Sequence, residues 1–144
     1  MRNDPWRRDA GRYAFRLTLD TRFADMDPNR HLNNSAIARL YEEARVRFHM
    51  DMRDRHRQVG QPHFLVARVE IDYLAEGHYP TPVDLGLGVL GVGGTSYRLG
   101  VGLFQNGACI GLSDAVMVYR GDNGPARVPD ILRTALESYA LRGQ

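Results

Sequence analysis

The sequence predicts an α+β domain in which one long helix lies against the concave face of an antiparallel sheet. Three observations lead to this prediction. Apolar residues follow a helical period from residue 36 to residue 48, an alternation of two begins at residue 63, and turn-forming residues separate the later strands. The chain has 144 residues, so we expect residues 1–144 to form a single domain with its own core.

The first half of the chain supplies one strand and the long helix. Residues 1–11 are charged and are expected to be loosely held, whereas residues 13–19 alternate as a half-buried strand does. The helix follows Asn33, Asn34 and Ser35, whose side-chain oxygens suit the backbone N–H groups at a helix start. Its predicted buried face repeats at steps of three and four residues: Ile37, Leu40, Tyr41, Ala44 and Phe48.

Four alternating strands make up most of the second half. They are joined by segments rich in glycine and proline, and Asn106-Gly107 is a strong signal of a two-residue hairpin. Consecutive hairpins predict an antiparallel meander. A short amphipathic helix opens at Pro129. The strands are expected at about residues 63–73, 83–89, 97–103 and 108–119.

Glycines recur at alternate positions of two neighbouring strands. They are Gly86 and Gly88 on one strand and Gly100 and Gly102 on the next. The missing side chains would let the long helix or a partner subunit approach the sheet closely.

Composition indicates an ordinary soluble globular protein. Hydrophobic residues make up 43% and charged residues 25%, and the net charge of +2 says little about partners. The arginines are scattered, so no nucleic-acid signature is present. Cys109 is the single cysteine, which excludes a disulfide framework within the chain and predicts a reducing, cytoplasmic compartment. No apolar run is long enough to cross a membrane.

Acid–base groups gather in the loop before the long helix. Asp27 is a potential nucleophile or general base, and His31 and Asn29 are placed to orient it, bind the substrate or move a proton. Backbone N–H groups near Asn34 and Ser35 would favour negative charge on a carbonyl oxygen. These groups suit attack on an activated acyl group. A thioester fits best, because a thiol has a pKa of about 8.5 and its thiolate leaves readily.

Residues 25–34, Asp-Met-Asp-Pro-Asn-Arg-His-Leu-Asn-Asn, and the later run Tyr41-Glu42-Glu43-Ala44-Arg45 carry a family resemblance. They resemble the signature of hotdog-fold acyl thioesterases of the 4-hydroxybenzoyl-CoA thioesterase-like group. They are also similar to the plant acyl-carrier-protein thioesterases. The resemblance implies a hotdog fold, with the sheet wrapped around the central helix, and hydrolysis of an acyl-CoA or acyl-carrier thioester. Arg30 stands where many bacterial relatives have glycine.

The resemblance also implies roles for particular residues. Asp27 would be the catalytic nucleophile or base, with Asn29 and His31 supporting it. The substrate is a coenzyme A thioester, and no cofactor or metal is expected. We expect a homodimer or homotetramer in which edge strands pair and two sites lie at the subunit boundary. The predicted substrate-binding residues are Asn34 and Ser35 at the helix start and Phe64, Val66 and Arg68 along one strand.

Two other functions remain open at this stage. One is a non-catalytic protein that binds or senses acyl-CoA. It is favoured by the absence of basic residues in the hairpin at 91–94, where some relatives hold the CoA phosphates. The other is an enoyl-CoA hydratase of the same fold, whose motif places histidine five residues after the aspartate rather than four, as between Asp27 and His31.

Several other polar residues have simpler interpretations. Asp25 is interpreted as a turn or cap residue. Glu43 either faces the site or forms an ion pair on the helix surface. The histidines show no spacing typical of metal ligands; they are His49, His56, His63 and His78.

Overall fold

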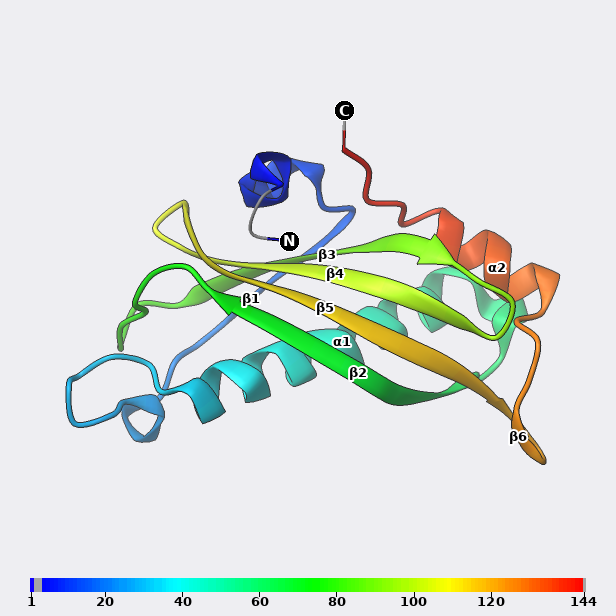
Figure 1. The fold of residues 1–144 in the computed structure, drawn as a ribbon, viewed down its shortest axis with the longest axis horizontal. Helices are drawn as coiled ribbons and strands as arrows, with labels where there is room; N and C mark the ends of the chain where they lie inside the picture. The colour runs from blue at the N-terminus through cyan, green and yellow to red at the C-terminus, as the bar shows by residue number, and fades with distance from the viewer. Residues whose placement is uncertain (2–3, 144) are drawn as a thin grey trace.

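The structure, a computed structural model, describes residues 1 and 4–143. Two α-helices and six strands make up most of this part, and Figure 1 shows their arrangement. Short 3-10 helices lie at Pro5–Arg8, Ala10–Arg12, Phe23–Asp25 and Arg57–Val59. The main elements are β1 (Phe15–Leu19), α1 (Asn34–Arg55), β2 (His63–Tyr73), β3 (Val83–Val92), β4 (Ser96–Gln105), β5 (Ala108–Gly121), β6 (Gly124–Pro125) and α2 (Asp130–Glu137).

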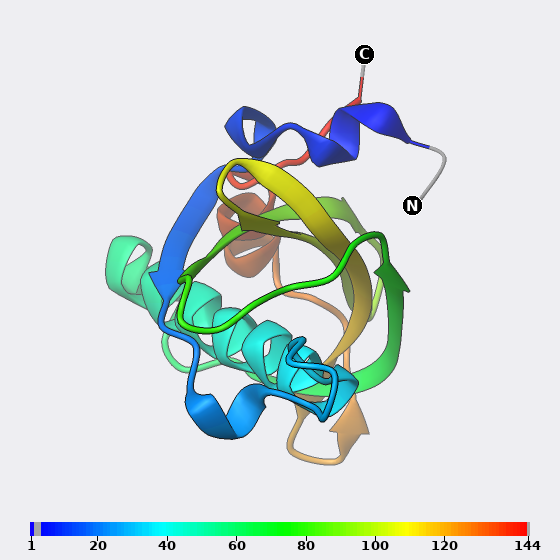
Figure 2. The same cartoon turned by 90° about the vertical axis from the view of Figure 1, so that its left-hand side faces the viewer.

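The sheet curls around α1, which lies along its concave face (Figures 1 and 2). The strand order is β1-β3-β4-β5-β2, and β6 pairs with β5. All of these neighbours are antiparallel. The α+β class and the central helix predicted from the sequence are confirmed. Neither helix in the described part is both long and apolar enough to cross a membrane.

The predicted four-strand meander is correct only for β3, β4 and β5. Strand β2 pairs with β5 and not with β3, so residues 74–82 cross from one side of the sheet to the other instead of forming a hairpin. Alternation of apolar residues shows which side chains share a face, but it does not identify the neighbouring strand. The crossover leaves β2 at the edge of the sheet.

The core lies between α1 and the inner face of the sheet. All five apolar residues predicted to face the core from α1 are buried, and Met52 extends this face by one turn. Burying a side chain of this size contributes about 1.5–3 kcal/mol. Asn33 is the N-cap, and its Oδ1 accepts a hydrogen bond of 2.7 Å from the backbone N–H of Ala36.

Where the glycines lie, the outer face of the sheet is covered by the two chain ends and not by the long helix α1. A Cβ atom added at Gly86 would lie 2.6 Å from Cγ of Tyr13, and one at Gly88 would lie 2.6 Å from Cβ of Leu141. Figure 2 shows both termini on the side of the sheet opposite α1. The expectation of a loosely held start is wrong for residues 4–11, because they form two 3-10 helices and Arg7 is only 2% exposed. Residues 2–3, to which the expectation also applied, lie outside the described residues.

Candidate active site

The loop between β1 and α1 is closed on itself and anchored to the crossover. The backbone N–H of Asn33 donates to the carbonyl of Asp25, and that of Leu32 donates to the carbonyl of Gly77, both at 2.8 Å. The loop therefore has a defined position relative to residues 74–82.

Asp27 is half-buried within this loop, and one of its carboxylate oxygens is held by the backbone. Oδ1 accepts hydrogen bonds from the N–H groups of Asn29 at 2.9 Å and His31 at 3.1 Å. Across the described residues, no hydrogen bond is made to Oδ2. The backbone therefore orients the carboxylate and leaves one oxygen available.

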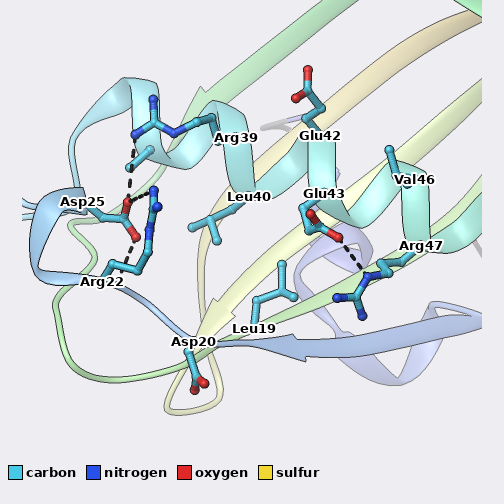
Figure 3. A pocket seen from close by; sticks show the side chains of 11 residues that line it. Leu19, Asp20, Arg22, Asp25, Arg39, Leu40, Glu42, Glu43, Val46 and Arg47 are labelled. Carbon is cyan, nitrogen blue, oxygen red and sulfur yellow. Dashed lines mark hydrogen bonds and ion pairs between the residues drawn. The ribbon is translucent and has the colours of Figure 1, made fainter.

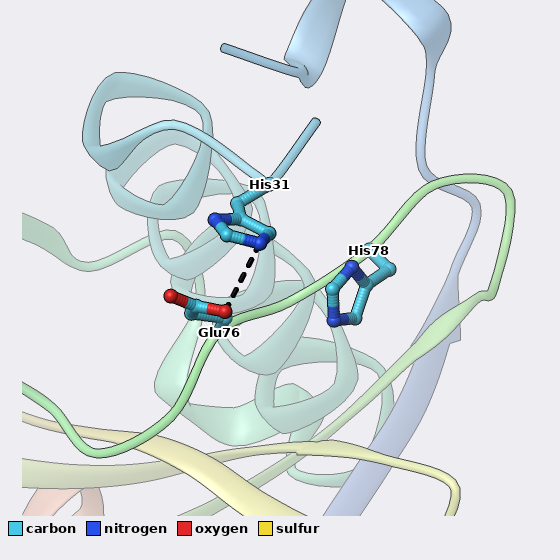
Figure 4. Close-up of side chains that lie close together, drawn as sticks. All are labelled: His31, Glu76 and His78. Atoms are coloured by element: carbon cyan, nitrogen blue, oxygen red, sulfur yellow. Dashed lines mark ion pairs between the residues drawn. The ribbon is translucent and has the colours of Figure 1, made fainter. Parts of the chain in front are cut away.

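Asn29 and His31 reach Asp27 through their main chains, and not through their side chains as the motif suggested. The side chain of Asn29 is exposed. The imidazole of His31 turns toward the crossover, where its Nε2 lies 3.0 Å from Oε2 of Glu76 and its ring centroid lies 5.2 Å from that of His78 (Figure 4). Sequence reasoning missed Glu76 and placed His78 nowhere in the site, because both are distant from His31 along the chain.

The start of α1 lies directly after this loop and presents free donors. Asn33 accepts through Oδ1 from Ala36 and through its carbonyl from Ile37. The N–H groups of Asn34 and Ser35 donate to no acceptor in the described part of the chain. Such groups at a helix N-terminus favour a nearby anion.

Arg30 adopts a backbone conformation that suits glycine, with φ of 65°. A residue with a Cβ atom pays roughly 1–2 kcal/mol for the left-handed region. Glycine avoids this cost, but its greater conformational freedom in the unfolded chain offsets part of the gain. We therefore expect Arg30→Gly to raise the free energy of unfolding by about 0.5–1 kcal/mol, as measured by urea denaturation. Asn29→Gly, at a neighbour without positive φ, should lower it. A free energy of unfolding below that of the wild type in Arg30→Gly would contradict backbone strain at this position.

Asp25 has the structural role expected for it. It is 3% exposed, and its carboxylate accepts from the backbone N–H of Arg22 at 2.9 Å and from the Arg22 guanidinium at 3.0 Å. Burial alone would raise the pKa of Asp25, but the hydrogen bonds from Arg22 and the charge of Arg39 outweigh it and lower this pKa. Asp25 therefore stays ionised and caps the 3-10 helix Phe23–Asp25.

A first cavity of about 430 Å³ lies between the end of β1 and α1 (Figure 3). Charged side chains dominate its wall, and Asp27 is not among them. Glu43 lines the cavity and forms an ion pair of 2.8 Å with Arg47 on the helix surface, which is the second of its two interpretations. Labelled lining residues in Figure 3 include Leu19, Asp20, Arg22, Asp25, Arg39 and Leu40.

A second cavity of about 400 Å³ lies between α1 and β2, and Phe64 and Val66 line it. The ring of His49 stacks on that of Phe64 at 4.9 Å, and its Nε2 is hydrogen bonded to the hydroxyl of Tyr97. Arg45 also lines the cavity, and its buried NH1 has no hydrogen-bond partner in the described chain. This cavity therefore has a mixed wall, in which apolar side chains lie beside charged ones and a buried cation.

Arg68 does not join Phe64 and Val66. A β-bulge lies between Val66 and Arg68, so the alternation of β2 changes phase and Arg68 projects from the outer face of the sheet. There its guanidinium pairs with Glu70 at 3.0 Å. The strip of binding residues predicted along β2 is therefore split between two faces.

His49 should make stability depend on pH. Burial, with smaller effects of Arg53 and Arg45, lowers the pKa of His49 from 6.5 to about 4. The unfolded chain therefore binds a proton at a higher pH than the folded chain, and stability is lost as pH falls from about 6.5 toward about 4. We expect urea denaturation of His49→Gln to show a smaller loss over this range than the wild type. Equal losses would contradict a neutral His49.

The antiparallel sheet curled around the long helix α1 is a hotdog fold. The sequence matches the family model of the thioesterase-like superfamily over residues 21–136, and the chain belongs to this superfamily. No match was found among curated proteins.

Solved structures share the fold over nearly their whole length. A thioesterase complexed with coenzyme A and Zn from Thermus thermophilus is 28% identical, with 92% of this chain and 98% of that chain covered and a TM-score of 0.77. The PA5185 protein from Pseudomonas aeruginosa is 24% identical, with 94% and 97% covered and a TM-score of 0.81. The BH1999 gentisyl-coenzyme A thioesterase is 14% identical, with 85% and 99% covered and a TM-score of 0.73.

Proposed function

We propose that this protein hydrolyses an acyl-CoA thioester to the carboxylic acid and free coenzyme A. The observation that carries the proposal is the geometry of Asp27, one oxygen held by two backbone N–H groups and the other without a hydrogen bond in the described chain. The free N–H groups of Asn34 and Ser35 lie at the start of α1, directly after this loop. The Thermus thioesterase, which was solved with coenzyme A, supports the choice of carrier.

The proposed step uses only groups of this chain and water. Oδ2 of Asp27 takes a proton from a water that attacks the carbonyl carbon, or attacks that carbon itself and is later released by water. The N–H groups of Asn34 and Ser35 stabilise the oxyanion. In the base route the C–S bond then breaks, and the thiolate takes up the proton that Asp27 received from water. In the nucleophile route the C–S bond breaks to give an anhydride between Asp27 and the acyl group, and the water that cleaves this anhydride supplies the proton for the thiolate. Asn29 and His31 act as positioning residues through their main chains.

A homodimer would complete the site. Strand β2 is an edge strand with four apolar side chains that are 40–51% exposed: Leu65, Val66, Val69 and Tyr73. Pairing of two β2 strands across a two-fold axis is antiparallel and places the Tyr73 end of one beside the His63 end of the other. The Asp27 loop is anchored at Gly77, just beyond Tyr73. Asp27 of one copy would then face the second cavity, which Phe64 lines, in the other copy. Two such dimers could assemble into a tetramer.

Complementation between two inactive chains tests whether the site is shared. In a dimer purified through two different tags, one chain carries Asp27→Asn and the other Val66→Arg, which fills the cavity beside β2. One of the two sites then has both native residues, and we expect about half of the wild-type activity. Homodimers of either variant serve as controls. If the tagged heterodimer is as inactive as these, each site belongs to one chain.

A panel of short, long and aromatic acyl-CoAs tests the activity itself. Release of free thiol with turnover is the expected result, in the cytoplasmic setting that the single cysteine suggests. Saturable binding without turnover would instead identify an acyl-CoA-binding protein. Water addition to an enoyl-CoA would identify a hydratase.

A further inference from the structure

Two loops bring two histidines and a glutamate together beside the candidate active site. His31 comes from the loop before α1, and Glu76 and His78 come from the crossover (Figure 4). One ligand atom from each residue lies within 4.8 Å of the other two. Nε2 of His31 and Oε2 of Glu76 are 3.0 Å apart. Two imidazoles and a carboxylate are a donor set that holds Zn²⁺ in three-ligand sites with one open position.

The backbone around this cluster is held in place. The N–H of Leu32, next to His31, donates to the carbonyl of Gly77, which separates Glu76 from His78. The buried side chain of Gln105 accepts from the N–H of His78 at 2.9 Å and donates to its carbonyl at 2.8 Å. Metal binding would therefore require movement of side chains but not refolding of either loop.

The side chains are free to make that movement. All three are partly or largely exposed, and the imidazole of His78 makes no hydrogen bond in the described chain. Ligand atoms at 2.0–2.1 Å in a tetrahedron lie about 3.3 Å apart. The separation of 3.0 Å between Nε2 of His31 and Oε2 of Glu76 is already close to this value. Rotation of the His78 side chain has to bring its ligand atom, now within 4.8 Å of the other two, to a similar distance.

We propose that His31, Glu76 and His78 form a binding site for a divalent transition metal, with Zn²⁺ as the best match. The carboxylate of Glu76 offsets part of the metal charge, and the fourth position is left for water or an anionic ligand. Since the N–H of His31 holds Asp27, a bound ion would also hold the Asp27 loop against the crossover. The metal site does not depend on the proposed hydrolysis.

Isothermal titration of chelator-treated protein with ZnCl₂ tests the site directly. We expect one ion per chain, with affinity lowered about tenfold or more in Glu76→Gln and in His78→Asn. His63→Ala, an exposed histidine at the start of β2, is the matched control and should bind as the wild type does. Binding that is absent, or equally strong in all three variants, would overturn the proposal.

Co²⁺ provides a second readout that needs no variant. Bound to the wild type, it should give the intense visible absorption of a tetrahedral site, and equimolar Zn²⁺ should remove it. A weak spectrum typical of hydrated Co²⁺ would count against the site. Asp27→Asn should bind Zn²⁺ like the wild type even if it cannot hydrolyse thioesters. Failure of the metal site and failure of the proposed enzyme are therefore distinguished.

Discussion

Asp27→Asn should lower kcat for thioester hydrolysis by about 10³-fold while leaving the fold intact. Asparagine keeps the Oδ1 oxygen that accepts hydrogen bonds from the N–H groups of Asn29 and His31. It removes only the negative charge and the basicity of Oδ2. Thiol release at saturating acyl-CoA measures the effect, and circular dichroism checks the fold.

Glu43→Gln is the matched control for this prediction. Glu43 is an exposed carboxylate that lines the first cavity and pairs with Arg47. Its variant should keep kcat close to the wild-type value. A larger loss in Glu43→Gln than in Asp27→Asn would move the catalytic carboxylate from the loop to the helix.

Asp114→Leu should lower the free energy of unfolding by about 3 kcal/mol, because it leaves a buried charge unpaired. Arg7 is 2% exposed, and its NH2 donates to Oδ1 of Asp114 at 2.8 Å. Burial alone would lower the pKa of Arg7, but the hydrogen bonds and charges of Asp114 and Tyr13 outweigh it and raise this pKa. Arg7 therefore stays charged. Chemical denaturation measures the loss.

The double variant Arg7→Met with Asp114→Leu separates the buried charge from simple loss of contact. Replacing both partners by apolar side chains removes the unpaired charge, so we expect much of the lost stability to return. If the double variant is as unstable as Asp114→Leu alone, the ion pair is not the reason for the loss.

Local sequence patterns predicted the structure correctly where residues that are close in the sequence also contact each other in the fold. The buried face of α1 follows from steps of three and four residues, and the cap at Asn33 follows from one side chain and the N–H three residues later. The hairpin at Asn106-Gly107 joins β4 to β5 as predicted. Asn106 and Gly107 both have positive φ, as such a tight turn requires.

The β-bulge between Val66 and Arg68 in β2 could not be predicted from the local sequence pattern. Apolar or small residues occupy both phases of the alternation from Leu65 to Val69, so one extra residue leaves no mark on the pattern. Its consequence is nevertheless large, because it separates Arg68 from Phe64 and Val66.

The sequence by itself determined the class of fold, the superfamily motif and the loop that holds Asp27, because each rests on contacts within a few residues. Only the tertiary structure decided that β2 lies beside β5, that the chain ends cover the outer face and that His31 meets Glu76 and His78. These contacts join segments far apart in the chain. They depend on how the curled sheet closes around α1, which no local periodicity encodes.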